Sequence, residues 1–315
     1  MREIDASDAK LIMRFDKPVR SAQGMAVYGD LVFQLFHTGQ CAVFDLNSRK
    51  EAPLAFFPLG SANAGDPTDD YINHANQCMF SDAHRNGNPL PLLYVTAGYG
   101  IGANDEGYYY HCAVEDIRLQ YDDKGAVIGG GSTCVQTIRY QDGPMEGLPW
   151  KQPCWGCPAW FVDNRERYIY MFSARYRTTE AFKHLYAENE YIITRFPLPD
   201  PLKGGAVRFG PQDILDQFTA PFDIPFTQGG MIAGNKLFYT FGLGDSRYPD
   251  GLRVYDLDQK RLCARADLSH TVFGREEIES CSFWRGQLIC NTNAKPQGGF
   301  YNLGSLWAEL TGDGA

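Results

Sequence analysis

Two closely spaced glutamates are the feature of this 315-residue chain that most directly suggests chemistry. Glu277 and Glu279 stand just before an apolar run that we expect to form a β-strand. Because side chains along a strand alternate with a period of two, both carboxylates should point to the same side. Such groups can act as general acids, bind a cation or accept hydrogen bonds from sugar hydroxyls. The alternative is a solvated strand entry balanced by Arg275, and we favour a functional role for Glu279 but not for Glu276.

His74 is the second candidate for acid–base chemistry. It lies in the motif NHAN, two residues before Asn76, ahead of another apolar run. The pKa of an imidazole lies near neutrality, so His74 could transfer protons or bind a metal. A structural or surface role is the commoner fate of a single histidine.

The motif CWGC, from Cys154 to Cys157, has the spacing of redox and zinc motifs. The βαβ context of a redox motif and the second ligand pair of a zinc site are both missing, which leaves a local disulfide or plain packing. Trp155 is of more interest as a stacking platform for a ligand. Arg175, which follows the second strand of the same segment, could meet an anionic group.

These residues fall into register when the chain is read as five divergent repeats. Each repeat has a polar residue, a short apolar strand, a Gly, Asn or Asp turn, and a second apolar strand, as in Gln228–Phe241. Repeats of this size, each a four-stranded antiparallel meander, predict an all-β fold, a five-bladed β-propeller. We expect one domain over residues 1–315. Its inner strands should start near residues 23, 76, 157, 228 and 279.

The strand Ala9–Phe15 has no partner nearby in the sequence, whereas the fifth repeat is one strand short. We therefore expect the N-terminal strand to complete the last blade and close the ring, which removes exposed sheet edges. An open sandwich is the alternative. Two smaller expectations concern Gly129–Gly131, read as part of a turn, and Gln212–Phe218, read as a helical turn.

The residues just before each inner strand of a propeller face the mouth of its central channel. We expect Gln23, Asn76, Trp155, Gln228 and Glu277 to bind a ligand there, together with Arg175, while Glu279 and His74 supply acid–base chemistry. Converging polar groups on an apolar scaffold indicate a binding site. The alternative is a hydrogen-bond network that only closes the channel. We assign no metal site, and a divalent cation in the channel is left open.

The composition narrows the range of partners. A formal net charge of −9 argues against nucleic acids and against anionic membrane surfaces. No apolar run approaches the roughly 20 residues that span a bilayer. The charged start has no apolar signal-peptide core and predicts a cytoplasmic protein, although removal of a signal peptide would place it outside the cytoplasm.

The whole chain resembles the β-propeller superfamily, with five blades as in glycoside hydrolases of the arabinanase and levansucrase type. In those families the resemblance implies an Asp at the first inner strand as nucleophile or base. The matching position here is Gln23, so their mechanism is not carried over. FTQG, Phe226–Gly229, is similar to a motif of propeller-type glutaminyl cyclases, but it stands in the fourth rather than the first repeat.

We therefore expect a propeller that binds a small polar ligand, such as a saccharide or glycoside, at the channel mouth. Hydrolysis or other processing of this ligand would need two suitably spaced carboxylates. A non-catalytic module that binds a ligand or a protein is the alternative, and the sequence leaves open whether the chain is an enzyme.

Overall fold

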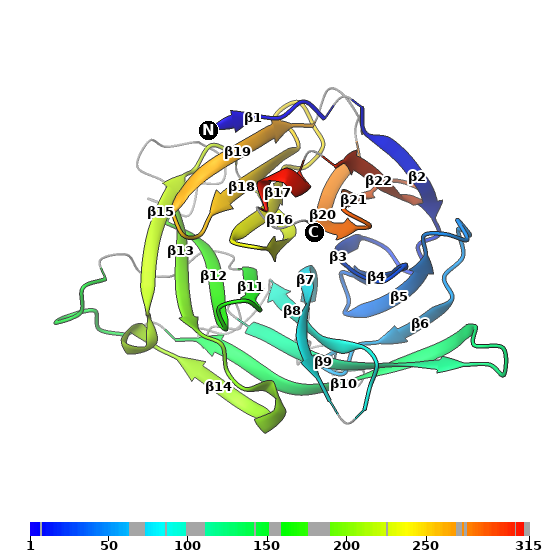
Figure 1. Cartoon of the computed structure of the whole chain (residues 1–315), viewed down its shortest axis with the longest axis horizontal. Coiled ribbons are helices and arrows are strands. Elements are labelled where there is room, and N and C mark those ends of the chain that lie inside the picture. The colour runs from blue at the N-terminus through cyan, green and yellow to red at the C-terminus, as the bar shows by residue number, and fades with distance from the viewer. Residues whose placement is uncertain are drawn as a thin grey trace.

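Five β-sheets surround a common axis as the blades of a β-propeller (Figure 1). The computed structural model describes residues 1–6, 8–62, 73–85, 87–98, 111–141, 143–150, 159–175, 190–224, 226–268, 273, 276–305 and 307–311. Within these ranges there is no α-helix, and therefore no helix long and apolar enough to cross a membrane. The predicted all-β, five-bladed fold is confirmed.

The first three blades follow the predicted meander, from the inner strand outwards. Blade 1 contains β3 (Ala22–Tyr28), β4 (Leu31–Phe36), β5 (Gln40–Asp45) and β6 (Ala55–Pro58). Blade 2 contains β7 (Asn73–His84), β8 (Pro91–Gly98), β9 (His111–Tyr121), β10 (Val127–Tyr140) and β14 (Gly205–Phe209). Blade 3 contains β11 (Ala159–Asp163), β12 (Tyr168–Arg175), β13 (Glu190–Pro197) and β15 (Asp216–Pro221).

The last two blades both take a strand from the N-terminus. Blade 4 contains β16 (Thr227–Ala233), β17 (Lys236–Phe241), β18 (Gly251–Asp256), β19 (Arg261–Asp267) and β1 (Arg2–Glu3). Blade 5 contains β20 (Glu277–Trp284), β21 (Gln287–Asn293), β22 (Gly298–Gly304) and β2 (Lys10–Phe15). Three short 3-10 helices complete the described elements: η3 (Pro201–Lys203), η4 (Pro211–Asp213) and η5 (Ala308–Leu310).

Strand β2 closes the ring, as the sequence predicts, by antiparallel pairing with β22. Phe15 is fully buried there and stacks on Phe300 with ring centroids 4.4 Å apart. Arg14 forms an ion pair of 2.7 Å with Glu276 and a hydrogen bond of 3.1 Å to the hydroxyl of Tyr301. Closure is therefore held by both apolar burial and a charged contact.

Two blades gain a fifth strand that the repeat pattern does not contain. Strand β14 pairs in parallel with β10, and β1 pairs in parallel with β19. The glycines 129–131, expected in a turn, instead lie in β10 opposite residues 118–120 of β9. The segment 212–218, expected as a helical turn, is divided between the end of η4 and the start of β15. In both cases the segment pairs with the preceding antiparallel strand of its blade, β10 with β9 and β15 with β13.

Aromatic side chains fill the space between blades 3 and 4. Phe172 on β12 contacts Tyr239 edge-on, with ring centroids 4.7 Å apart, and Tyr255 at 5.3 Å. All three residues are fully buried. Because aromatic pairs add to the free energy gained from burial alone, this interface stabilises the packing of the two blades.

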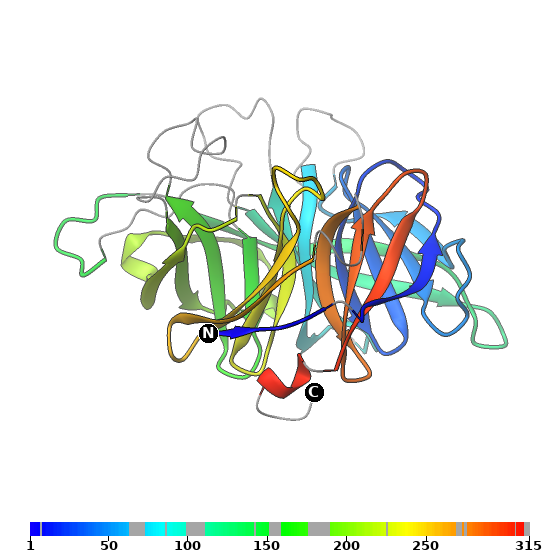
Figure 2. The same ribbon diagram turned by 90° about the horizontal axis from the view of Figure 1, so that it is seen from above.

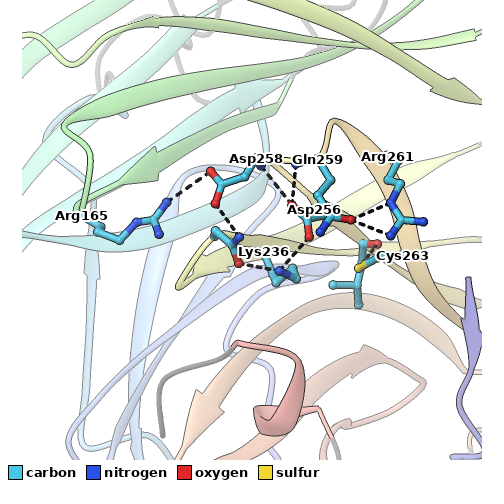
Figure 3. A network of polar contacts seen from close by, with 9 residues as sticks. Arg165, Lys236, Asp256, Asp258, Gln259, Arg261 and Cys263 are labelled. Carbon is cyan, nitrogen blue, oxygen red and sulfur yellow. Dashed lines mark hydrogen bonds and ion pairs between the residues drawn. The ribbon is translucent and has the colours of Figure 1, made fainter.

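Polar contacts join the hairpin turns of the same two blades (Figure 3). Arg165 lies 3.5 Å from Asp258, which also accepts a hydrogen bond of 2.6 Å from Asn235. Lys236 forms an ion pair of 3.0 Å with Asp256. Arg165 and Asp258 are largely exposed, so their ion pair contributes at most about 1 kcal/mol.

Candidate functional site

The starts of the inner strands and the C-terminal segment lie at opposite edges of the ring. The backbone oxygen of Thr311 lies beside Gly234, in the turn that ends β16. Figure 2 shows η5, drawn in red, at this lower edge. The upper edge is therefore the one at which β3, β7, β16 and β20 begin, and it contains the predicted mouth.

Each of these four inner strands has a shift of register, as at a β-bulge, within its first residues. The shifts fall between Ala22 and Met25, Asn73 and Gln77, Thr227 and Gly230, and Ile278 and Ser280. The four predicted register residues Gln23, Asn76, Gln228 and Glu279 all lie inside them. A bulge re-aims side chains and interrupts strand pairing, and bulges are frequent beside functional sites. The residues aligned by the sequence repeats therefore mark the β-bulge at the start of each of these four inner strands.

The side chains at the bulges of β3, β16 and β20 contact one another. The Nε2 atom of Gln23 donates a hydrogen bond of 3.5 Å to Oε1 of Glu279. Gln228 donates through Nε2 to Oε1 of Glu277, at 3.0 Å, and to the backbone oxygen of Gly242, at 2.7 Å. The structure thus brings together four of the residues predicted for the mouth.

The bulge in β20 breaks the strict alternation that the sequence argument used for the two glutamates. Glu279 is fully buried, whereas Glu277 is only partly buried. The side-chain amide of Asn293, the last residue of β21, nevertheless lowers the pKa of both carboxyl groups, against the effect of burial. They therefore belong to one cluster, although a regular strand does not place them there.

Burial governs the electrostatics of this cluster. It raises the pKa of Glu279 well above the usual value, and the charges of Glu277 and Asp250 add to the rise. The hydrogen bond from Asn293 and the charge of Lys17 act in the opposite direction. Burial likewise raises the pKa of Glu277, against the hydrogen bonds from Gln228 and Asn293. A proton is therefore held on Glu279 at pH values where an exposed glutamate is ionised.

Asp250, which the sequence analysis missed, is a third acid of the cluster. It directly precedes β18, is 1% exposed and accepts a hydrogen bond of 2.8 Å from the amide of Gly244. Burial raises its pKa to about 7, and the charges of Glu277 and Asp245 act in the same direction. Three acids with raised pKa values thus gather at one side of the mouth.

Several buried oxygens at this mouth lack a donor. Within the described part of the chain, no hydrogen bond reaches Oε1 of Gln23, Oδ1 of Asn76 or Oε2 of Glu279. Native proteins pair nearly all such atoms, and an unpaired one costs about 1–3 kcal/mol. Two amide oxygens that only accept, and a carboxyl oxygen that donates when Glu279 is protonated, therefore favour a ligand that can both donate and accept hydrogen bonds.

Below the mouth, the inner strands approach closely. Oε1 of Gln77 accepts a hydrogen bond of 2.8 Å from the amide of Gly230, which links β7 to β16. A Cβ atom added to Gly229 would lie 2.5 Å from the backbone oxygen of Asn76 and 2.6 Å from Oγ of Ser280. Only glycine fits between these strands, so this packed layer forms a floor beneath the polar cluster.

Aromatic rings stand next to Gln228 at the edge of the cluster. Phe226 and Tyr248 meet edge-to-face with ring centroids 4.7 Å apart, and the guanidinium of Arg247 lies 5.1 Å from the Tyr248 ring. Phe226 has a φ of 65°, which is unusual for a residue other than glycine. The sequence indicated aromatic residues near the loops but not which of them flank the mouth.

The side chains of the remaining predicted site residues are not among the described parts of the structure. Trp155 and the CWGC motif lie outside the described residues, as does position 157, the predicted start of the third inner strand, which begins at Ala159. His74 is part of β7 and Arg175 ends β12, but only their backbones are described. Among the described residues, no group of three His, Cys, Asp or Glu side chains could hold a metal ion. Catalytic roles for Glu279 and His74 stay predictions.

No protein-family model and no curated protein sequence matches this chain. Among solved structures, a glutaminyl cyclase from Myxococcus xanthus is 10% identical and aligns over 93% of this chain and 95% of its own, with a TM-score of 0.47. Raptor from Chaetomium thermophilum is 11% identical over 90% of this chain and 20% of its own, with a TM-score of 0.35. AztD from Citrobacter koseri is 14% identical over 80% of this chain and 48% of its own, with a TM-score of 0.30.

Proposed function

We propose that this propeller binds a small, hydroxyl-rich ligand, such as a saccharide, at the mouth formed by Gln23, Asn76, Gln228, Glu277 and Glu279. The observation that carries the proposal is the set of buried oxygens without hydrogen-bond partners at the bulged strand starts. A sugar hydroxyl can donate to these oxygens and accept from the side-chain amides beside them. One class of ligand therefore satisfies both kinds of group.

The charge of the cluster disfavours anionic ligands. A phosphate or carboxylate would meet like charge on Glu277 and Asp250 when these acids are ionised, and like charges in a poorly solvated site repel strongly. A neutral polyol meets no such penalty. The rings of Phe226 and Tyr248 offer apolar faces to the C–H groups of a sugar, and Trp155 remains a predicted stacking residue.

A second candidate function, hydrolysis of a glycoside, is favoured by the two glutamates that share Asn293. Their pKa values are both raised, and the fully buried Glu279 keeps its proton more firmly. In this scheme Glu279 protonates the leaving oxygen while Glu277 acts as base or nucleophile. The predicted role of His74 would be an additional proton transfer.

Screening on a glycan array tests the proposal. We expect the wild-type protein to bind a defined set of glycans and E279Q to bind them at least about tenfold more weakly, because Gln has an NH2 group, which only donates hydrogen bonds, in place of Oε2. The matched control is E309Q, which changes a largely exposed glutamate in η5 at the other edge of the ring.

Equal glycan binding by wild type and E279Q would refute the site, and no binding by the wild type would refute the ligand class. Release of reducing sugar from the bound glycan, lost in E277Q and E279Q, would support hydrolysis. Binding without release would leave the protein a ligand-binding module.

A further inference from the structure

Lys17, a residue of the ring-closing N-terminal segment, reaches the polar cluster from outside the repeat pattern. It stands two residues after the end of β2 and is partly buried. Its Nζ atom donates a hydrogen bond of 3.1 Å to Oδ1 of Asn293 and another to the backbone oxygen of Ala294. The N-terminal segment therefore ends its closure of the ring directly at the mouth.

The contact with Lys17 determines which way the side-chain amide of Asn293 points. An ammonium group only donates hydrogen bonds, so the Asn293 atom that it contacts must be the oxygen. The NH2 group of Asn293 is then left for the side of Glu277 and Glu279, whose pKa values this amide lowers. In the register of the sheet, Asn293 lies directly opposite Glu277.

We propose that Lys17 is a positioning residue of the mouth, because its ammonium group orients the amide of Asn293 toward Glu277 and Glu279. The inference rests on the proposed function in placing the ligand at this mouth, although the contact itself can be tested without a ligand. The segment that closes the ring therefore also supplies the cation that orients Asn293 in the site.

The charged groups around Lys17 agree with this role. Burial lowers the pKa of Lys17, and the charge of Glu279 opposes that effect while Lys295 reinforces it. In return, Lys17 lowers the pKa of Glu279 against burial and the charges of Glu277 and Asp250. Asp245 faces Glu277 and Asp250 from the loop that precedes β18.

The test compares K17M, K17R and K295M in the full chain. Lys295 is exposed beside the same cluster, so K295M removes one positive charge from the neighbourhood without removing the contact to Asn293. Protein labelled with 13C at the glutamate carboxyl carbon is titrated by NMR, with E277Q and E279Q used to assign the two signals. Urea midpoints show that each variant is folded.

In K17M we expect the Glu279 midpoint to move to higher pH, because the nearby cation and the oriented amide are both lost. In K17R the charge and a donor remain, so the midpoint should stay closer to the wild-type value, and K295M should match the wild type. An unchanged Glu279 midpoint in folded K17M would overturn the inference.

Glycan binding by the same variants separates this inference from the proposed function. If the wild-type protein binds a glycan and K17M binds it at least tenfold more weakly, both the positioning role and the proposed function are supported. Equal glycan binding by wild type and K17M contradicts the positioning role alone. A shifted Glu279 midpoint without glycan binding by the wild type contradicts the proposed ligand and supports the positioning role.

Discussion

Replacing Asp250 with Asn should change how the stability of the propeller depends on pH. The carboxyl group of Asp250 is buried, and its Oδ2 atom has no hydrogen-bond partner within the described residues. Burial raises its pKa from 3.8 to about 7, helped by the charge of Glu277. Asn resembles the protonated acid in size and keeps an oxygen for the amide of Gly244.

The direction of this pH dependence follows from the number of protons bound by the folded and by the unfolded protein. Between pH 3.8 and about 7 the folded protein retains the proton of Asp250, whereas the unfolded chain has released it. The free energy of unfolding therefore falls as the pH rises through this window, and the loss is complete above the folded-state pKa. A shift of about three units at 1.36 kcal/mol each corresponds to about 4 kcal/mol. D250N lacks this loss, so its stability relative to wild type should rise by about 4 kcal/mol between pH 4 and pH 8.

Urea unfolding followed by tryptophan fluorescence at several pH values measures this difference. D8N, which removes an exposed acid, is the reference for the loss of one formal charge. Wild-type and D250N curves that stay parallel from pH 4 to pH 8 would refute a raised pKa for Asp250. They would also remove the reason for treating it as part of the buried acid cluster.

Two further predictions concern the packing that supports the site. G229A should lower the free energy of unfolding by about 1–3 kcal/mol in urea titrations, because its Cβ would lie 2.5 Å from the oxygen of Asn76. G131A, whose Cβ would meet no atom within 4 Å, should change it by less than about 1 kcal/mol, and an equal loss in both variants would contradict the packed floor. F15A should cost about 3–5 kcal/mol, because Phe15 is fully buried against Phe300. In limited proteolysis, the N-terminal segment of F15A should be cleaved faster than that of the wild-type protein. If F15A resists the protease as well as the wild-type protein does, β2 does not hold the ring closed.

The sequence was sufficient for the architecture because most strands of each blade and the turns between them come from one repeat, and the fifth repeat lacks only the strand that β2 supplies. The register of polar residues before the inner strands was visible for the same reason, and it led to Gln23, Asn76, Gln228 and Glu279. The dipeptides Gln-Gly at Gln23 and Gln228 were a usable sign of the bulges, since glycine in a strand often marks one.

The partners of Glu279 were not predictable in the same way. Lys17, Asn293 and Asp250 come from a ring-closing segment, a strand end and a loop, and only the closed ring brings them together. Their spacing along the chain has no periodicity that could reveal this. Strand β14 was missed for a related reason, because it leaves the neighbourhood of blade 3 to pair with β10.

The most direct test of the central claim is a crystal structure of the protein soaked with the glycan selected on the array. We expect density for the sugar at the starts of β3, β16 and β20, with hydroxyl groups within about 3.2 Å of Gln23 Oε1 and Glu279 Oε2. A sugar bound elsewhere on the ring, with these oxygens still unpaired, would contradict it.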